Sequence, residues 1–399
     1  MSKTPKLRFK EFSGDWESKL LEDLSNKIMV GIASSTTHAY RKNGIIMFRN
    51  QNIRPNYLDD TDILYLDEEY EKIHKNKRLM PGDLLTARTG YPGTTCVVPS
   101  KYINTQTFTT LITRPNKNLA ISEYLSQYIN SDIGIKFFKS VEIGGGQKNV
   151  NVETLKSFQI FIPSLQEQEK IALFLSLIDK KISLQGEKVE ALKDYKRGMM
   201  QKIFSRELRF KDDDGRDYPE WEEKKLSELV IFINGKAHEN SIDEFGNYIV
   251  VNSKFISTNG NVVKMSNENL CPLKKNDIVM VMSDVPNGKA LSKCYLIDEE
   301  NKYTLNQRIC ALRSKGNDYK FLYYAINRNK YYLKFDNGVG QTNLRKDDVL
   351  ECPILIPCKE EQKKVGDLLF YIDYKIEKEQ EKLDSLNKYK KGLLQQMFV

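Results

Sequence analysis

One feature of this sequence constrains the fold more than any other: a long amphipathic stretch occurs twice. Residues 162–205 align without a gap on residues 356–399, and each copy follows a larger block of different sequence. Residues shared by both copies include Pro163 and Pro357, Asp179 and Asp373, Tyr195 and Tyr389, and Gly198 and Gly392. Self-similarity at a long fixed period predicts a duplicated architecture, because each copy is expected to fold in the same way.

Each copy carries a single apolar stripe. Its residues alternate in steps of four and three positions, which is the a/d pattern of a coiled coil. The stripes consist of Ile171, Leu175, Ile178, Ile182, Val189, Leu192, Met199 and Ile203, and of Val365, Leu369, Ile372, Ile376, Leu383, Leu386, Leu393 and Met397. The first copy predicts a helix over 165–204, about 60 Å long at ~1.5 Å per residue. A stripe on so long a helix needs a partner, and the other copy supplies it.

Polar residues interrupt both stripes at matching places, and such residues can fix register and partner. Gln185 and Glu379 occupy one place, and Lys196 and Lys390 occupy the other. We expect the two helices to run antiparallel, because the block between them then starts and ends at the same end of the coil, and connections are usually short. The alternative is two unrelated amphipathic helices packed on separate cores.

The repeat extends beyond the helices. Leu7-Arg8-Phe9-Lys10 recurs as Leu208-Arg209-Phe210-Lys211, and a tryptophan in an acidic stretch follows each, Trp16 and Trp221. We expect both tryptophans to be buried, and the N-terminal Leu-Arg-Phe to lie near the end of the second helix. The predicted domains are an adaptor and first block (1–163), a first spacer helix (164–205), a second adaptor and block (206–357), and a second spacer helix (358–399).

Within the blocks, short apolar runs bounded by turn residues predict strands, and tyrosine-rich runs predict helices. The expected strands are 44–49, 83–88 and 108–113 in the first block, and 247–252, 277–282 and 309–312 in the second. The expected helices are 122–129 and 319–327, and each block closes with a loop, a short helix and a strand. The predicted fold class is therefore α+β: two α/β domains with mainly antiparallel sheets and two long antiparallel coiled-coil helices, related by a pseudo-two-fold internal repeat.

Composition permits an anionic partner and offers little chemistry. The 399 residues carry a net charge of +8 with a pI near 8.9, which is compatible with nucleic acid. The six cysteines form no Cys-x-x-Cys and the three histidines are far apart. No metal site is therefore expected, and the scattered thiols suit a reducing cytoplasm. No run of apolar residues is long enough to cross a membrane. The Asn-Pro-Pro-aromatic motif of an amino-methyltransferase and the phosphate-binding loop are both absent.

The ordered double array resembles the specificity subunit of type I restriction-modification systems. Each helix is preceded by Gly-x-x-Gln and then Ile-Pro, has Glu-Gln shortly after that Ile-Pro, and ends in Tyr-Lys-[Arg/Lys]-Gly. The Leu-Arg-Phe adaptor follows the first helix. The resemblance covers the whole chain. It implies that each block is a target recognition domain that reads one half of a split DNA site, and that the subunit itself is not catalytic.

The resemblance also implies the partners: double-stranded DNA, two methylation subunits and, in the full restriction system, restriction subunits. S-adenosylmethionine, ATP and Mg²⁺ are expected on those partners, with no cofactor or metal on this chain. A coil of about 60 Å would act as a ruler that sets a gap of one to two DNA turns, at ~34–36 Å per turn. Because the blocks differ, the site should be asymmetric.

Three groups of loop residues are candidates for DNA contact, since Arg suits guanine, Asn and Gln suit adenine, and Asp suits cytosine. In the first block they are Arg49, Asn50, Gln51, Thr86, Arg88, Thr89, Tyr91, Gln147, Lys148 and Asn149. In the second they are Asn252, Lys254, Ser283, Asp284, Asn287, Lys289, Gln341, Thr342, Asn343, Arg345 and Lys346. The competing interpretation is that these polar residues form turns or cap local backbone.

Two other functions remain open from the sequence. A coiled-coil assembly scaffold would bind proteins through the same blocks and would not bind DNA. An enzyme acting alone is disfavoured by the missing motifs.

Overall fold

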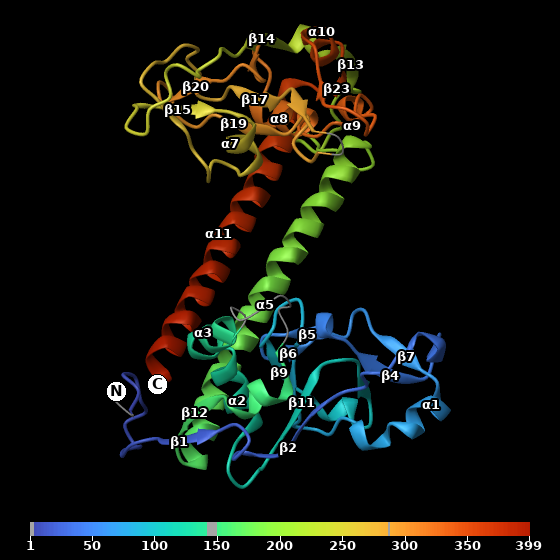
Figure 1. Ribbon diagram of the computed structural model, residues 1–399. Coiled ribbons are helices and arrows are strands. Elements are labelled where there is room, and N and C mark those ends of the chain that lie inside the picture. The colour runs from blue at the N-terminus through green and yellow to red at the C-terminus, as the bar shows by residue number, and fades with distance from the viewer. Residues whose placement is uncertain (1–3, 142–149, 286–287) are drawn as a thin grey trace. The chain divides into compact units, whose positions relative to one another are not determined.

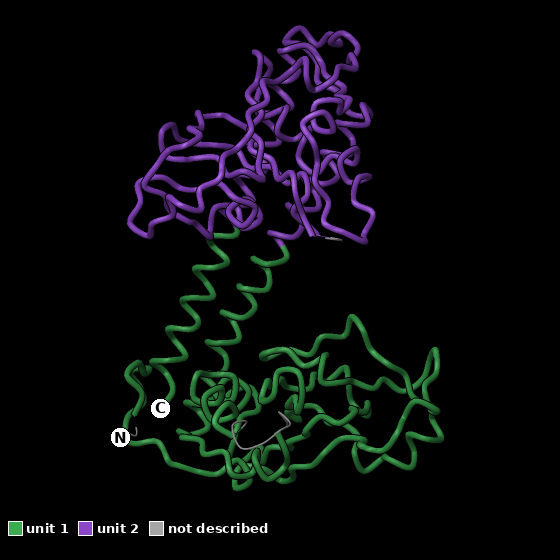
Figure 2. The backbone as a smooth tube through the Cα atoms, turned by 45° about the horizontal axis from the view of Figure 1, so that its top comes forward, with its two compact units in different colours: residues 1–187, 380–399 green, residues 188–379 purple. Residues whose placement is uncertain are grey.

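A computed structural model describes residues 4–141, 150–285 and 288–399 (Figure 1). The chain divides into two compact units, shown in separate colours in Figure 2. Unit 1 comprises residues 1–187 and 380–399, and unit 2 comprises residues 188–379. Each unit therefore combines one globular block with parts of both long helices.

The long helices are α5 (Leu165–Phe204) and α11 (Lys359–Met397), as the heptad pattern predicts. They run antiparallel in both units. In unit 1, Asp179 of α5 pairs with Lys390 of α11. In unit 2, Lys196 of α5 lies 2.6 Å from Asp373 of α11. Residues later in one helix thus meet residues earlier in the other, which confirms the predicted direction.

Unit 1 contains two four-stranded sheets. The first is antiparallel, in the order β2 (Ser25–Val30), β11 (Leu111–Pro115), β8 (Leu84–Thr86), β9 (Thr95–Val97). The second has the order β10 (Gln106–Thr107), β4 (Ile45–Phe48), β7 (Leu64–Leu66), β3 (Tyr40–Arg41), with β10 and β4 parallel. Two further antiparallel pairs are β1 (Glu17–Leu20) with β12 (Gln159–Ile162), and β5 (Ile53–Arg54) with β6 (Tyr57–Leu58). The helices are α1 (Glu68–Ile73), α2 (Ser122–Ile129), α3 (Asp132–Val141) and α4 (Val152–Lys156).

Unit 2 repeats this plan. Its main sheet has the order β14 (Val230–Asn234), β21 (Ile309–Ser314), β17 (Ile278–Val281), β19 (Cys294–Leu296). A second sheet has the order β16 (Met265–Ser266), β15 (Tyr248–Val251), β20 (Tyr303–Leu305). The two-stranded pairs are β13 (Glu222–Lys225) with β23 (Pro353–Ile356), and β18 (Ser283–Asp284) with β22 (Thr342–Asn343). The helices are α6 (Leu226–Leu229), α7 (Ser253–Ser257), α8 (Tyr319–Ile326), α9 (Lys330–Leu333) and α10 (Lys346–Leu350).

The first part of each apolar stripe belongs to a globular core as well as to the coil. Ile171, Leu175 and Ile178 are buried in one cluster with Trp16 and Tyr124. The equivalent residues of α11 are buried with Trp221 in unit 2. Farther along the helices, Ile182, Leu192, Ile376, Leu383 and Leu386 are only half-buried. Each apolar stripe therefore packs on two partners, which are the other long helix and, through the first turns of its own helix, the core of a globular block.

Each adaptor joins the end of a long helix, as predicted. The Leu7 N–H donates to the Gln396 carbonyl at 2.9 Å, and the Leu208 N–H donates to the Lys202 carbonyl at 3.0 Å. Those two contacts are equivalent in the repeat. The N-terminal segment therefore completes the end of α11 in the way that the internal adaptor completes the end of α5.

Candidate functional site

In unit 1 the predicted loops converge on Arg88, which follows β8. Its N–H donates to Asn50 Oδ1 at 2.7 Å, and its guanidinium donates to the Val150 carbonyl at 3.2 Å. The Val150 N–H donates back to the Arg88 carbonyl at 3.3 Å. These bonds gather the three candidate loops at one end of the sheet. Gln147, Lys148 and Asn149 lie outside the described residues.

Several unit 1 candidates have internal partners. Thr86 is fully buried and its hydroxyl lies 2.8 Å from that of Thr95, so it supports the strand and does not face a ligand. Arg49 pairs with Asp62 at 2.9 Å, and Gln51 donates to the same carboxylate at 2.7 Å. The prediction for Thr86 is therefore corrected, because that residue lies in β8 before the loop begins.

The exposed tip of this loop consists of Thr89, Gly90 and Tyr91. Tyr91 is 76% exposed, which is unusual for a large aromatic side chain. Gly90 and Gly93 adopt φ of +79° and +89°, a region that glycine enters without steric cost. The turn therefore presents one aromatic ring to solvent, and such a ring can stack on a base or contact its edge.

In unit 2 two of the candidate loops pair as strands. Ser283 and Asp284 of β18 lie opposite Asn343 and Thr342 of β22. The Gln341 amide donates to the Ser283 hydroxyl at 2.6 Å. The loop after β17 and the loop before α10 thus form one surface.

Two unit 2 candidates stabilise local backbone. The Asp284 carboxylate accepts the N–H groups of Val285, Ala290 and Leu291 at 2.9, 2.6 and 2.9 Å, so it organises the loop. Asn252 caps α7 by accepting the Phe255 N–H at 2.9 Å. For these two residues the structure supports the competing interpretation, in which polar side chains satisfy nearby backbone groups.

Four candidate cations in unit 2 remain exposed, and none of them pairs with a carboxylate among the described residues. They are Lys254, Lys289, Arg345 and Lys346. Asn287 lies outside the described residues. Exposed cations without carboxylate partners are suited to phosphate oxygens, which position a protein on a duplex. Unit 2 therefore offers charge where unit 1 offers an aromatic tip.

The same ion pair recurs in both units at the start of the strand that leads into a candidate loop. In unit 1 Arg114 of β11 lies 2.7 Å from Asp83, which precedes β8. In unit 2 Arg313 of β21 lies 2.7 Å from Asp277, which precedes β17. Each carboxylate raises the pKa of its arginine, chiefly by hydrogen bonding. The pairs fix the strands that carry the candidate loops.

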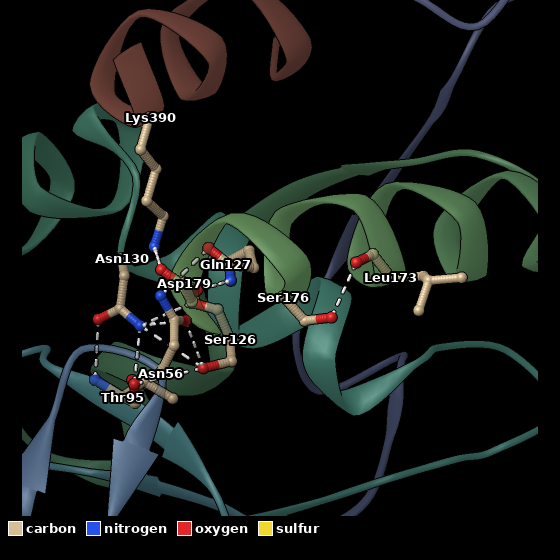
Figure 3. A network of polar contacts seen from close by, with 9 residues as sticks. All are labelled: Asn56, Thr95, Ser126, Gln127, Asn130, Leu173, Ser176, Asp179 and Lys390. Atoms are coloured by element: carbon tan, nitrogen blue, oxygen red, sulfur yellow. Dashed lines mark hydrogen bonds and ion pairs between the residues drawn. The ribbon is translucent and has the colours of Figure 1, made fainter. Parts of the chain in front are cut away.

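A polar network ties the unit 1 site to both long helices (Figure 3). The Thr95 N–H donates to Asn130 Oδ1 at 3.0 Å, and Asn130 Nδ2 donates to the Thr95 carbonyl at 2.7 Å. Asn130 ends α2, in which Gln127 donates to Asp179 of α5 at 2.6 Å. Asp179 also pairs with Lys390 of α11. The strand beside the candidate loop is thereby held in place relative to both helices.

Unit 2 builds the equivalent network with different side chains. The Cys294 N–H donates to Asn327 Oδ1 at 3.0 Å. The Tyr324 hydroxyl donates to Asp373 at 2.6 Å, and Lys196 pairs with the same carboxylate. Burial, followed by the bond to Asp373, raises the pKa of Tyr324, so its hydroxyl stays protonated as a donor. Sequence reasoning did not assign these roles, although the repeated Ile-Asp pair was a signal for Asp179 and Asp373.

The described residues contain no group of three or more His, Cys, Asp or Glu that could hold a metal ion. None of the helices in the described part of the chain is both long enough and apolar enough to cross a membrane.

Comparison with known proteins identifies relatives along nearly the whole chain. The chain is 27% identical over 307 residues to the type I restriction enzyme MjaVIII specificity subunit of Methanocaldococcus jannaschii, covering 71% of each chain. It is 24% identical over 403 residues to the putative type I restriction enzyme MjaX specificity subunit of the same organism, covering 96% of this chain and 93% of the relative.

Two solved structures share the fold. The S subunit of a type I restriction-modification system from M. genitalium matches with a TM-score of 0.64 at 16% identity, over 99% of both chains. A chain from a structure of type I R-M complex assembly matches with a TM-score of 0.54 at 16% identity, over 95% of this chain and 96% of the other. The family described as type I restriction modification DNA specificity domain matches residues 13–194 and 218–388. Since this double match covers most of the sequence, the chain belongs to that family.

Proposed function

We propose that this chain is the DNA specificity subunit of a type I restriction-modification complex, and that each unit reads one half of an asymmetric bipartite site. The observation that carries the proposal is a duplicated framework with unlike loops. Arg114–Asp83 and Arg313–Asp277 repeat at the starts of the strands that lead into the candidate loops. Among the candidate residues, one unit exposes Tyr91 and the other exposes four cations. Two units with the same framework and different exposed loop residues are suited to recognising two different DNA half-sites.

The spacing between the half-sites is set, in this proposal, by the long helices. A helix of 40 residues spans roughly 60 Å at ~1.5 Å per residue. Ion pairs of α5 with α11 in each unit fix the register of the two helices. A fixed register gives a fixed length, so the number of base pairs between the half-sites follows from the number of helical residues.

Two equivalent surfaces on the helices are proposed to bind two methylation subunits. Leu177 of α5 and Tyr371 of α11 occupy matching repeat positions and are 58% and 54% exposed. Tyr195 and Tyr389 form a second matching pair, 54% and 56% exposed. Exposed apolar side chains that recur in both copies favour binding of the same partner twice.

The chemistry is proposed to reside on those partners. Methyl transfer would use S-adenosylmethionine on the methylation subunits, and restriction subunits, where present, would use ATP and Mg²⁺. Two features of this chain support a non-catalytic role: it lacks the methyltransferase and phosphate-loop motifs, and its described residues offer no metal-binding cluster.

Methylome sequencing tests the proposal. The gene is deleted from its host and then restored on a plasmid, and modified bases are mapped by long-read sequencing. Restoration should return adenine methylation at one bipartite, non-palindromic sequence. A methylome that is identical with and without the gene would overturn the proposal.

The assembly-scaffold alternative is separated by salt dependence. A DNA-reading complex should lose affinity for duplex DNA steeply as salt rises, because bound phosphates release counterions. The purified complex of this chain with its methylation partner is titrated with a labelled duplex at several salt concentrations. A scaffold would show no salt-dependent affinity for the duplex.

A further inference from the structure

Two cations in unit 2 lie close together outside the candidate set. Lys293 precedes β19, and its ammonium donates to the Ser257 carbonyl at the end of α7 at 2.9 Å. Arg328 follows α8, and its guanidinium donates to the Leu291 carbonyl at 2.9 Å. The Arg328 N–H donates to the Ser292 carbonyl at 3.0 Å. The two side chains therefore flank the same short segment, 291–293.

Neither cation has a carboxylate partner among the described residues, although both are partly buried. Burial, followed by the positive charge of Arg328, lowers the pKa of Lys293. Partial removal of a charge from water is unfavourable unless an opposite charge compensates it. The carbonyl bonds supply hydrogen-bond acceptors, but they leave both positive charges without a counter-ion.

The shared framework does not require these charges. In the repeat, the Asn130 bond to Thr95 is equivalent to the Asn327 bond to Cys294. In unit 1, Ser131 follows Asn130 and Thr94 precedes Thr95. At the equivalent places unit 2 has Arg328 and Lys293. Unit 1 thus builds the same strand and helix end with neutral side chains.

The segment between the two cations carries a further unusual feature. Ser292 is fully buried and adopts φ of +53°, where unit 1 has Gly93. Its hydroxyl has no hydrogen-bond partner among the described residues. A non-glycine residue in this conformation is uncommon, and such residues concentrate at functional positions.

The cations also extend the candidate interface. Ser257, which accepts the Lys293 bond, ends the helix that carries Lys254. Lys289 lies on the same loop as Lys293. We infer that Lys293 and Arg328 bind a backbone phosphate of the DNA half-site that unit 2 reads. This inference rests on the proposed function and adds a contact that unit 1 lacks at the equivalent place.

The test uses the full chain in complex with its methylation partner and a duplex that carries the recognised site. Lys293→Gln and Arg328→Gln remove charge but keep an N–H donor for the Ser257 and Leu291 carbonyls. The double variant should bind roughly tenfold more weakly at low salt, and the slope of log K against log salt should fall by about 1. The methylated sequence should stay unchanged, because a phosphate contact carries no base information.

Matched variants separate charge from folding. Lys293→Arg should restore most of the affinity of Lys293→Gln. Lys302→Gln in the same unit removes a lysine already paired with Glu299 at 2.9 Å and should change neither affinity nor slope. If the glutamine variants fail to fold, the wild-type complex is instead measured on duplexes in which one phosphate at a time is replaced by a neutral methylphosphonate. One such replacement in the unit 2 half-site should reproduce the loss of affinity predicted for the double variant.

The outcomes distinguish the two levels of inference. A wild-type complex without sequence-specific DNA affinity contradicts the proposed function itself. A wild-type complex that binds specifically, together with glutamine variants of equal affinity and equal salt slope, overturns the phosphate contact alone. On the methylphosphonate route, equal binding to every neutralised duplex in the unit 2 half-site overturns it as well.

Discussion

The two junctions between long helices and globular blocks share one carboxylate geometry and differ in one partner. Asp179 in unit 1 and Asp373 in unit 2 each accept a lysine from the other long helix. The third member is an amide in unit 1, Gln127, and a phenol in unit 2, Tyr324. The interhelical charge pair is therefore retained in both copies, whereas the contact with the block has diverged. The register between the helices depends on the interhelical charge pair, and the attachment of each block depends on the contact made by Gln127 or Tyr324.

The adaptors show a similar difference. Arg8 pairs with Glu167 at 2.8 Å, and Arg209 pairs with Glu361 at 2.9 Å. In unit 2 the Trp221 ring N–H also donates to Glu361 at 3.1 Å. In unit 1 the Trp16 N–H is buried with no partner among the described residues. The tryptophan ring is buried in both units, but only in unit 2 does its N–H donate to the helix carboxylate.

The largest expected effect comes from removing the buried carboxylates of α5 and α11 that bind the adaptor arginines. Glu361→Ala leaves both Arg209 and the Trp221 N–H without this acceptor and should cost about 3 kcal/mol of unfolding free energy. Glu167→Ala should cost about 1 kcal/mol less, because Trp16 has no bond to lose. Denaturant unfolding followed by hydrogen exchange in each unit measures both. Equal costs would mean that the tryptophan bond contributes nothing.

Charge reversal at the junctions should have a smaller effect that differs between the units. Asp179→Lys alone places two lysines together and should cost about 2 kcal/mol. Adding Lys390→Asp should recover at least half, because the Gln127 amide can turn its oxygen towards the new lysine.

The same exchange in unit 2 should recover less. Asp373→Lys with Lys196→Asp replaces the carboxylate that accepts the Tyr324 O–H by an ammonium, which can only donate to the phenol oxygen, so the O–H loses its acceptor. Thermal unfolding of the single and double variants gives the two coupling energies. Full recovery in both units would show that the third partner is energetically irrelevant.

Much of the fold could be predicted from the sequence because its signals are long and duplicated. The heptad pattern predicted α5 with its observed bounds, and the adaptor repeat predicted the contact of Leu7 with the end of α11. Turn residues located β8 and β17. These features depend on burial of apolar stripes and on turn chemistry, which leave a regular pattern in the residues.

The candidate site could be predicted only in outline. Polar loop residues serve a ligand or their own backbone, and the sequence does not distinguish the two. Asp284 and Asn252 bind backbone N–H groups, whereas Tyr91 and Lys289 face solvent. Lys293 and Arg328 gave no motif, because only the fold brings them to one segment. The sequence hinted at these two cations only through the comparison of the two halves, because neutral residues occupy the equivalent positions in unit 1.

The central claim is that the two helices set the gap between two half-sites that unlike loops read. It is tested most directly by inserting one heptad into α5 between Asp179 and Lys196, and one into α11 between Asp373 and Lys390, which preserves both ion pairs. The methylome of cells carrying this variant is then sequenced. The account predicts the same two half-sequences separated by about three more base pairs, since seven residues add ~10 Å of helix. Altered half-sequences, or methylation at an unchanged gap, would contradict it.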